Sequence, residues 1–228
     1  MAMPLTPIET KTFSSHELKL VRGTYGVMAR LGTQQLSLRR IAKELGVSPA
    51  LLVYHFGSKD NLLFETMHWA LAGSVRRLQR QIAGVEDPAE ALRTSIDAIF
   101  VGARANRAFY LIYLDLVQYA VRHESFTKLA VLLREHIDDS YARVIGQGVQ
   151  AGVFEVQDVE LAARQVRAIV EGGFVQWLQT DDWEETYDAL QRDSYAAALK
   201  LLAPAPPAPR LRRTRSRAGS PSSSSRQA

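Results

Sequence analysis

Between residues 37 and 63 the apolar positions recur at helical spacing in short blocks, and residues that cap helices or form turns separate these blocks. The first block places four apolar side chains on one helical face, namely Leu38, Ile41, Ala42 and Leu45. Gly46 supplies a turn, after which Ser48 and Pro49 have the residue types that start a helix. Gly57 ends this second helix, and Ser58 caps a third. The pattern predicts a short helix, a tight turn and a second short helix, the layout that enters the major groove of DNA.

Caps and apolar periodicity predict further helices along most of the chain. Ser14 and Glu17 have the spacing of a capping box, before a helix that ends at Gly32. A long helix is expected from residue 58 to about residue 83, where it links two domains. The other segments with helical signals are 87–102, 107–122, 124–148, 158–179 and 182–202. Since no segment alternates as a strand does, the sequence predicts an all-α fold of about nine helices.

The domain organisation follows from these boundaries. We expect a flexible N-terminal arm at residues 1–13, a three-helix helix-turn-helix DNA-binding domain at 14–64, and a helical ligand-binding and dimerisation domain at 65–202. Residues 203–228 are rich in Pro, Ser, Arg and Ala, have little to bury, and are expected to form a disordered basic tail. Two interpretations of the tail stay open: its arginines add non-specific DNA affinity, or it is a solvated extension without a dedicated role.

Charge is distributed unevenly along the chain, although the net charge is +4. Residues 1–64 carry eight basic and four acidic side chains, whereas residues 65–202 carry 14 basic and 20 acidic ones. Positive charge therefore gathers in the segment predicted to meet DNA phosphates. The chain has no cysteine, which excludes disulfides, thiolate zinc sites and cysteine nucleophiles. No apolar run is long enough to cross a bilayer and the first residues lack the order of a secretory signal, so we expect a cytoplasmic protein with no membrane partner.

Several short motifs occur together between residues 20 and 67: Gly32, Ile41-Ala42, Gly46-Val47-Ser48, His55-Phe56, and Ser58-Lys59-Asp60 with Leu62-Leu63. Together they resemble the amino-terminal domain of TetR-type transcriptional regulators. The segment FGSKDNLLFETM is most similar to the branch that includes the choline-responsive repressor of betaine synthesis. One position departs from the family, whose recognition helix ends in Leu-Tyr-x-His-Phe, because this chain has Leu52-Val53-Tyr54-His55-Phe56. The phosphate contact of the family tyrosine is therefore not assigned to Tyr54 by the resemblance.

The resemblance and the helical pattern together indicate which residues would meet DNA. Lys59 matches the family lysine that holds a phosphate. The exposed edge of the recognition helix is expected to contain Ser48, Ala50, Leu51, Tyr54 and His55. Arg39 and Arg40, on the preceding helix, would reach the DNA backbone. For each charged residue the alternative is an ordinary solvated surface position.

The middle of the chain is unusually aromatic for a helical core. Its candidate ligand-binding residues are Trp69, Phe100, Phe109, Tyr110, Tyr113 and Tyr119. Asp115 and Gln118 add polar groups to the same predicted helix. The resemblance implies an inducer pocket in this region, and the aromatic set favours an apolar pocket with a few polar contacts. Ordinary packing is the alternative for any single aromatic residue. The implied inducer is small and either largely apolar or cationic, and no cofactor is expected.

Two apolar stripes near the end of the chain predict an oligomer surface. The first contains Ala162, Val166, Ile169, Val170, Gly173, Phe174 and Trp177, and the second contains Ala189, Tyr195, Ala196, Leu199 and Leu202. The resemblance implies a homodimer that pairs through these two helices as a four-helix interface. The alternative is that both stripes pack only within the monomer.

The sequence shows no catalytic motif. Phosphate-cradling glycine loops, nucleophile elbows and paired carboxylates at a recognisable spacing are all absent, and the five histidines are scattered. His123, Glu124 and His136 would be the set able to meet at a metal, but neither a metal nor an enzymatic activity is expected. The expected function is a repressor that binds a double-stranded DNA operator and is released by a small-molecule inducer. The alternative is a TetR-fold architectural factor that binds DNA without an inducer.

Overall fold

The computed structural model describes residues 11–203. This part of the chain folds into nine helices and contains no strand. The helices are α1 (Ser15–Leu31), α2 (Leu38–Leu45), α3 (Pro49–Phe56), α4 (Lys59–Ile82), α5 (Pro88–Asp97), α6 (Ala103–Ala120), α7 (Glu124–Gln150), α8 (Val159–Trp177) and α9 (Trp183–Leu202). The predicted all-α fold is therefore confirmed for the described residues. Residues 1–10 and 204–228, which hold most of the predicted arm and tail, lie outside them.

Short polar side chains start most of the helices, as the sequence predicts. Ser14 and Glu17 form the capping box of α1. Five further N-cap side chains each accept a backbone N–H at the start of their helix: Ser37, Ser48, Ser58, Asp87 and Asp158. Such a bond satisfies an N–H that has no partner within the helix. Asp182, also predicted to cap a helix, makes no side-chain hydrogen bond of this kind.

The loop between α5 and α6 differs from the prediction. α5 ends at Asp97 rather than near residue 102, and α6 begins at Ala103 rather than at Arg107. The buried amide of Asn106 accounts for the difference: it accepts from Val101 N–H (2.9 Å) and donates to the Ile99 carbonyl (2.9 Å). These bonds fix residues 98–102 as a turn at a place where apolar spacing alone suggested a longer helix.

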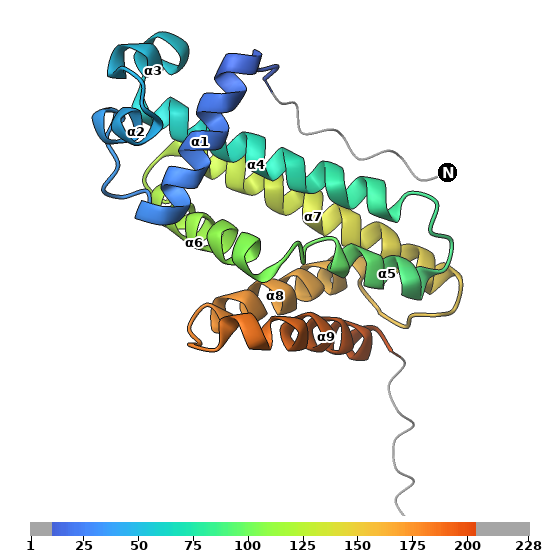
Figure 1. Cartoon of the computed structure of the whole chain (residues 1–228). Coiled ribbons are helices and arrows are strands. Elements are labelled where there is room, and N and C mark those ends of the chain that lie inside the picture. Colours follow the sequence, from blue (N-terminus) through green and yellow to red (C-terminus); the bar gives the residue numbers. More distant parts are fainter. Residues whose placement is uncertain (1–10, 204–228) are drawn as a thin grey trace, which may run out of the picture.

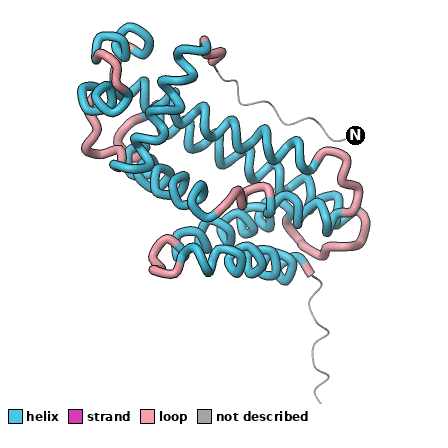
Figure 2. The backbone as a smooth tube through the Cα atoms, viewed as in Figure 1, coloured by secondary structure: helices cyan, strands magenta, loops and turns pink. Residues whose placement is uncertain are grey.

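α1, α2 and α3 gather at one end of the molecule, and α4 runs from them along α7 into the helical body (Figure 1). α8 and α9 pack against each other on the opposite side of the body, and short loops join most of the helices (Figure 2). The core around α1–α4 also contains Ile112 and Leu116 of α6 and Phe126 and Leu129 of α7. The predicted domain boundary at residue 64 therefore falls inside α4, and the core of the first domain continues into the second.

Hydrogen bonds from α6 connect the body to the helix-turn-helix end. The Asp115 carboxylate Oδ2 accepts from both the N–H (2.7 Å) and the hydroxyl (3.0 Å) of Thr33, which follows α1. Near the end of α6, Tyr119 donates its hydroxyl to Asp60 Oδ1 in the first turn of α4 (2.5 Å). α6 is thus hydrogen-bonded to two separate segments of the helix-turn-helix end.

Candidate nucleic-acid interface and ligand cavity

The turn between α2 and α3 presents the short helix α3 at the surface. Gly46 adopts the left-handed conformation (φ 66°, ψ 32°), which glycine takes without the steric cost of a side chain. The Val47 N–H donates to the Ala42 carbonyl (3.0 Å) and closes the turn. Leu52 and Phe56 are buried and anchor one face of α3 in the core. The opposite face of α3 is therefore left to solvent.

This exposed face contains most of the residues predicted on the recognition helix. Tyr54 is 83% exposed, Ser48 and Ala50 are exposed, and Leu51 is half-buried. Val53, which is 48% exposed, lies on the same helix and was not among the predicted contacts. The sequence feature that could have identified Val53 is the departure from the family pattern at residues 52–56. Val53 and Tyr54 are the large side chains that α3 offers to a partner.

His55 does not share this face, so its prediction as a DNA contact is not supported. Its ring lies 5.4 Å from the ring of His16, and its Nδ1 lies 3.8 Å from the carboxylate of Glu17. The backbone N–H of Ser14 is the main cause that lowers the pKa of Glu17 to about 2, so this carboxylate is negative beside the imidazole. The side chain of His55 is directed at α1, where it helps to hold α3 against the rest of the domain.

Three predicted cations lie on the helices that flank α3. Arg39 and Arg40 are exposed on α2, and Arg40 Nη2 pairs with Glu44 Oε1 at 3.2 Å. Lys59 is the first residue of α4, is half-buried, and places its Nζ 5.9 Å from the centre of the Tyr119 ring. An exposed ion pair such as Arg40–Glu44 contributes little to stability, so pairing leaves Arg40 available to a phosphate.

A cavity of about 460 Å³ lies between the helix-turn-helix end and the body. Its wall is formed by parts of α1, α4, the α5–α6 turn, α6, α7 and α8. Four of the six predicted ligand residues line it: Trp69, Phe109, Tyr110 and Tyr113. The volume is within the range of about 300–1,000 Å³ that small-molecule sites occupy. The aromatic segment of the sequence therefore borders a cavity and is not simply packed core.

The other two predicted residues, Phe100 and Tyr119, do not line the cavity. Phe100 lies in the turn after α5 and stacks on Phe174, with ring centroids 4.8 Å apart. Tyr119 shares α6 with Tyr113, but a separation of six residues rotates it by about 120° around the helix. It stacks on His123 (3.9 Å) at the DNA-binding end. Both aromatic residues are packing residues, which corrects the prediction.

The cavity also contains polar residues that the sequence did not identify. Glu171 Oε2 accepts from Arg167 Nη1 (3.0 Å), and Arg167 Nε donates to Asp138 Oδ1 (2.6 Å). Burial raises the pKa of Glu171 above its ordinary value. The hydroxyl of Tyr141 is buried and has no hydrogen-bond partner. Burial also raises the pKa of the Tyr110 and Tyr113 phenols, which line the same wall.

The predicted oligomer stripe faces the wrong way for an interface. Five of its residues are buried in the core of this chain: Ala162, Val166, Val170, Phe174 and Trp177. The others predicted for contact, Ile169, Tyr195 and Leu199, are half-buried. A groove on the outer side of α8 and α9 is instead lined largely by small residues, among them Ala168, Gly172, Gly173 and Ala189 together with Ile169. Most of the predicted stripe on α8 is therefore core, while Ile169, Gly173, Trp177 and Ala189 of the two stripes also line the groove. That α8 and α9 form the dimer interface stays a prediction.

Neither a metal site nor a membrane-spanning helix is found in residues 11–203. No group of three or more His, Cys, Asp or Glu side chains in this range is arranged to hold a metal ion. His123, considered as a ligand, stacks instead on Tyr119. None of the helices in the same range is long and apolar enough to cross a membrane.

Comparison with known proteins identifies both parts of the chain. Residues 20–66 match the profile described as bacterial regulatory proteins of the tetR family, and residues 88–200 match the C-terminal region of BetI-type transcriptional repressors. The HTH-type transcriptional regulator BetI 1 of Chromohalobacter salexigens is 35% identical over 92 residues, or 39% of this chain and 45% of that protein. BetI of Vibrio parahaemolyticus is 28% identical over 160 residues (68% and 76%). The regulatory protein RaaS of Mycobacterium tuberculosis is 30% identical over 168 residues (73% of each chain).

Solved structures share the fold. A TetR transcription regulator from Haloarcula marismortui has a TM-score of 0.74 at 24% identity and covers 83% of this chain and 99% of its own. A transcriptional regulator from Saccharomonospora viridis, in complex with choline, has a TM-score of 0.74 at 21% identity, with 81% and 95% covered. Given the two matching profiles and the helix-turn-helix end, the chain belongs to the TetR family of bacterial transcriptional regulators, with a C-terminal region of BetI type.

Proposed function

We propose that this protein is a homodimeric repressor that binds an operator through α3 and leaves it when a small molecule enters the cavity. The observation that carries the proposal is the composition of the cavity wall. Arg22 and Tyr25 of α1 belong to it, together with residues of α4 and of the body helices α6–α8. A ligand there would contact the DNA-binding domain and the body at once, so its binding energy can depend on how the two are positioned.

Release requires that the ligand have a higher affinity for the arrangement of the dimer that cannot bind DNA than for the DNA-bound arrangement. α6 connects the two sites in this chain, because Phe109 and Tyr113 line the cavity and Asp115 bonds to Thr33. The outer face of α8 and α9 is the proposed dimer surface. A two-fold pair would place its two α3 helices about 34–36 Å apart, the spacing of successive major grooves.

The proposal is tested by measuring DNA binding and ligand stabilisation on the same full-length protein. Fluorescence anisotropy with DNA from upstream of its own gene should show specific binding. A thermal-shift screen, with choline as one compound because a structural relative binds it, should then find compounds that raise the melting temperature. At least one of these should release the DNA. Specific DNA binding without any such compound would favour the architectural alternative, and absence of DNA binding would refute both.

Replacing Tyr54 with alanine is expected to weaken operator binding about tenfold or more without affecting stability. Tyr54 is 83% exposed and its ring packs edge-on against His55 at 5.1 Å, so its removal leaves the core of α3 intact. Anisotropy titrations and thermal denaturation would measure the two quantities. Thr12→Ala, at an exposed position before α1, is the control. Unchanged operator affinity would remove Tyr54 from the interface.

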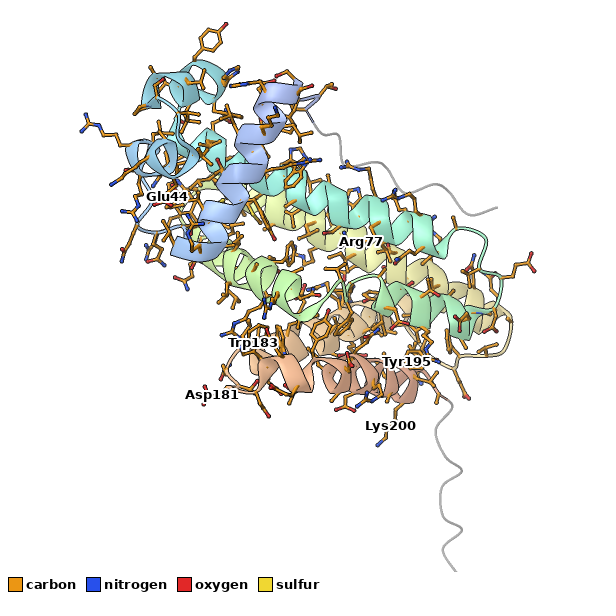
Figure 3. The ribbon with its side chains drawn as sticks, in the orientation of Figure 1. Glu44, Arg77, Asp181, Trp183, Tyr195 and Lys200 are labelled. Atoms are coloured by element: carbon orange, nitrogen blue, oxygen red, sulfur yellow. The ribbon has the colours of Figure 1, made fainter. Side chains whose placement is uncertain are left out.

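Replacing Lys59 with alanine is expected to weaken binding to operator and to unrelated DNA by a similar factor. A phosphate contact carries no base information, and its loss should reduce the slope of log K against log salt by about 0.9 per contact. Lys200→Ala is the matched control, because Lys200 is exposed on α9, far from the α3 end (Figure 3). A loss confined to the operator, or an unchanged slope, would contradict a phosphate contact.

A further inference from the structure

The cavity has two chemically different ends. Its exposed residues include Arg22 of α1 and Arg76 of α4, with Arg77 half-buried between them and the interior. Its most buried polar residues are Tyr141, which is 1% exposed, and Asn106, which is 3% exposed and already hydrogen-bonded to the α5–α6 turn. Glu171 is half-buried beside Arg167, which also lines the cavity. Aromatic side chains form much of the wall between these ends. A bound molecule that spans the cavity would therefore meet the guanidinium groups of α1 and α4 at the mouth, and inside it a phenol with a carboxylate that is paired with Arg167.

The mouth carries positive charge that the wall does not neutralise. Among the described residues that line the cavity, Glu171 is the one carboxylate, and it lies at the inner end. Arg22 lies over the Trp69 ring, with Cζ 5.8 Å from its centre. Arg77 donates through Nε to the Ala98 carbonyl (3.2 Å), and burial lowers its pKa. Figure 3 labels Arg77 on α4. Guanidinium groups bind carboxylates in paired hydrogen bonds.

The inner end offers hydrogen bonds to an uncharged polar group. The Tyr141 hydroxyl is fully buried and has no partner, which is costly unless a bound molecule supplies one. Glu171 lies on the same wall and is already paired with Arg167 at 3.0 Å. Arg167 donates to both Glu171 and Asp138, so its guanidinium offsets only part of the charge of Glu171. Glu171 therefore attracts an organic cation less than an unpaired carboxylate would. It still accepts hydrogen bonds, so a hydroxyl group suits this end.

We propose that the cavity selects an amphipathic organic acid, with its carboxylate held by Arg22, Arg76 and Arg77 and a hydroxyl group against Tyr141 and Glu171. The inference rests on the proposed function, since it names the chemical class of the releasing ligand. An organic acid would act differently from a cationic ligand in one respect. The carboxylate would bridge α1 and α4, because Arg22 lies on the first helix and Arg76 and Arg77 lie on the second.

The ligand class is tested with four rigid probes of similar shape, titrated into the full-length protein by calorimetry. The first is 4'-hydroxybiphenyl-4-carboxylate, which has both groups. Biphenyl-4-carboxylate lacks the hydroxyl, 4'-hydroxybiphenyl-4-carboxamide lacks the charge, and 4'-hydroxy-4-(aminomethyl)biphenyl carries a positive charge instead. We expect the first probe to bind about tenfold or more tightly than the amide and the amine, and several-fold more tightly than the probe without the hydroxyl.

Substitutions in the cavity wall test which residues cause these binding preferences. The double change Arg76→Gln and Arg77→Gln should abolish the preference for the acid over the amide, whereas Arg80→Gln, an exposed arginine of α4 outside the cavity wall, should preserve it. Tyr141→Phe should remove the preference for the hydroxylated acid over the acid without the hydroxyl. It should leave the preference for the hydroxylated acid over the amide unchanged. Melting temperatures establish that each variant is folded, and Arg76→Gln alone provides a milder change at an exposed position.

The outcomes separate this inference from the proposed function. Tighter binding of the amine, equal binding of acid and amide, or no binding of any probe would overturn the assignment of an organic acid. If a cationic or neutral compound then released the DNA, the proposed function would stand with a different ligand. If specific DNA binding persisted and no compound of any class released it, the proposed function would fail as well. A preference for the acid that survives in the Arg76/Arg77 variant would overturn the role of the mouth arginines.

Discussion

Replacing Phe174 with alanine is expected to lower the free energy of unfolding by about 3–5 kcal/mol, as truncation of a fully buried phenylalanine does. Phe174 is 0% exposed. Its ring stacks on Tyr110 (4.0 Å) and Phe100 (4.8 Å), so α8 is tied to α6 and to the α5–α6 turn through one side chain. The change would leave a cavity among aromatic rings that rigid neighbours cannot fill. Urea denaturation followed by circular dichroism, at fixed protein concentration, measures the effect.

The neighbouring change Val175→Ala is the control for Phe174. Val175 is 36% exposed on α8 and does not line the groove of the proposed dimer surface, so its truncation should alter the free energy of unfolding by less than about 1 kcal/mol. Sedimentation of the Phe174 variant would then measure its oligomeric state and show whether Phe174 belongs to the core or to an interface between subunits. A Phe174 variant that unfolds like the wild type but dissociates into monomers would restore the original prediction that this residue meets a partner subunit.

Replacing Asp115 with alanine is expected to accelerate hydrogen exchange of the α1–α3 amides more than tenfold. Oδ2 of Asp115 accepts two hydrogen bonds from Thr33, which is 2% exposed, so the variant leaves a buried N–H without its partner. Loss of bonds to a charged acceptor, with a donor left unpaired, costs about 2–3 kcal/mol. Hydrogen exchange measured by mass spectrometry resolves this local opening from global unfolding.

Gln118→Ala is the matched control on the same helix. Gln118 is exposed and accepts one neutral hydrogen bond from Gln34 (2.9 Å), so exchange in α1–α3 should change by no more than a few-fold. The Asp115 variant should also weaken the effect of a ligand on operator affinity, since α6 carries both the cavity wall and this contact. Full ligand response together with unchanged exchange would show that the coupling runs through other contacts.

Local signals explain why the helices could be predicted. Ser48, Pro49 and Gly57 fix the start and end of α3 through bonds and backbone angles that involve neighbours in the chain, so their meaning does not depend on the rest of the fold. The turn after α5 was missed because it depends on Asn106. A polar side chain that bonds to the preceding turn looks, in the sequence, like any polar position on a helix.

The sites were harder to predict because they depend on which faces meet. On α8, Phe174 and Val175 are adjacent apolar residues on different faces, and apolar spacing does not say which face is covered by α9 and which is free. Similarly, Tyr141 and Glu171 reach the cavity from helices far along the chain from the aromatic segment. Helical periodicity alone could place Tyr119 and Tyr113 on different faces of one helix. The residues that each of them contacts could be identified only from the packed structure.

The contribution of α1 to the cavity mouth limits how this regulator can change. Arg22 and Tyr25 line the proposed effector site, while the neighbouring residues Val21 and Thr24 are buried in the core of the helix-turn-helix end. Altering the mouth to accept a different compound would therefore also disturb the seating of the operator-reading end. A biosensor for a new analyte is better built by varying the inner wall around Tyr141, where changes in selectivity and changes in DNA affinity can be tuned separately.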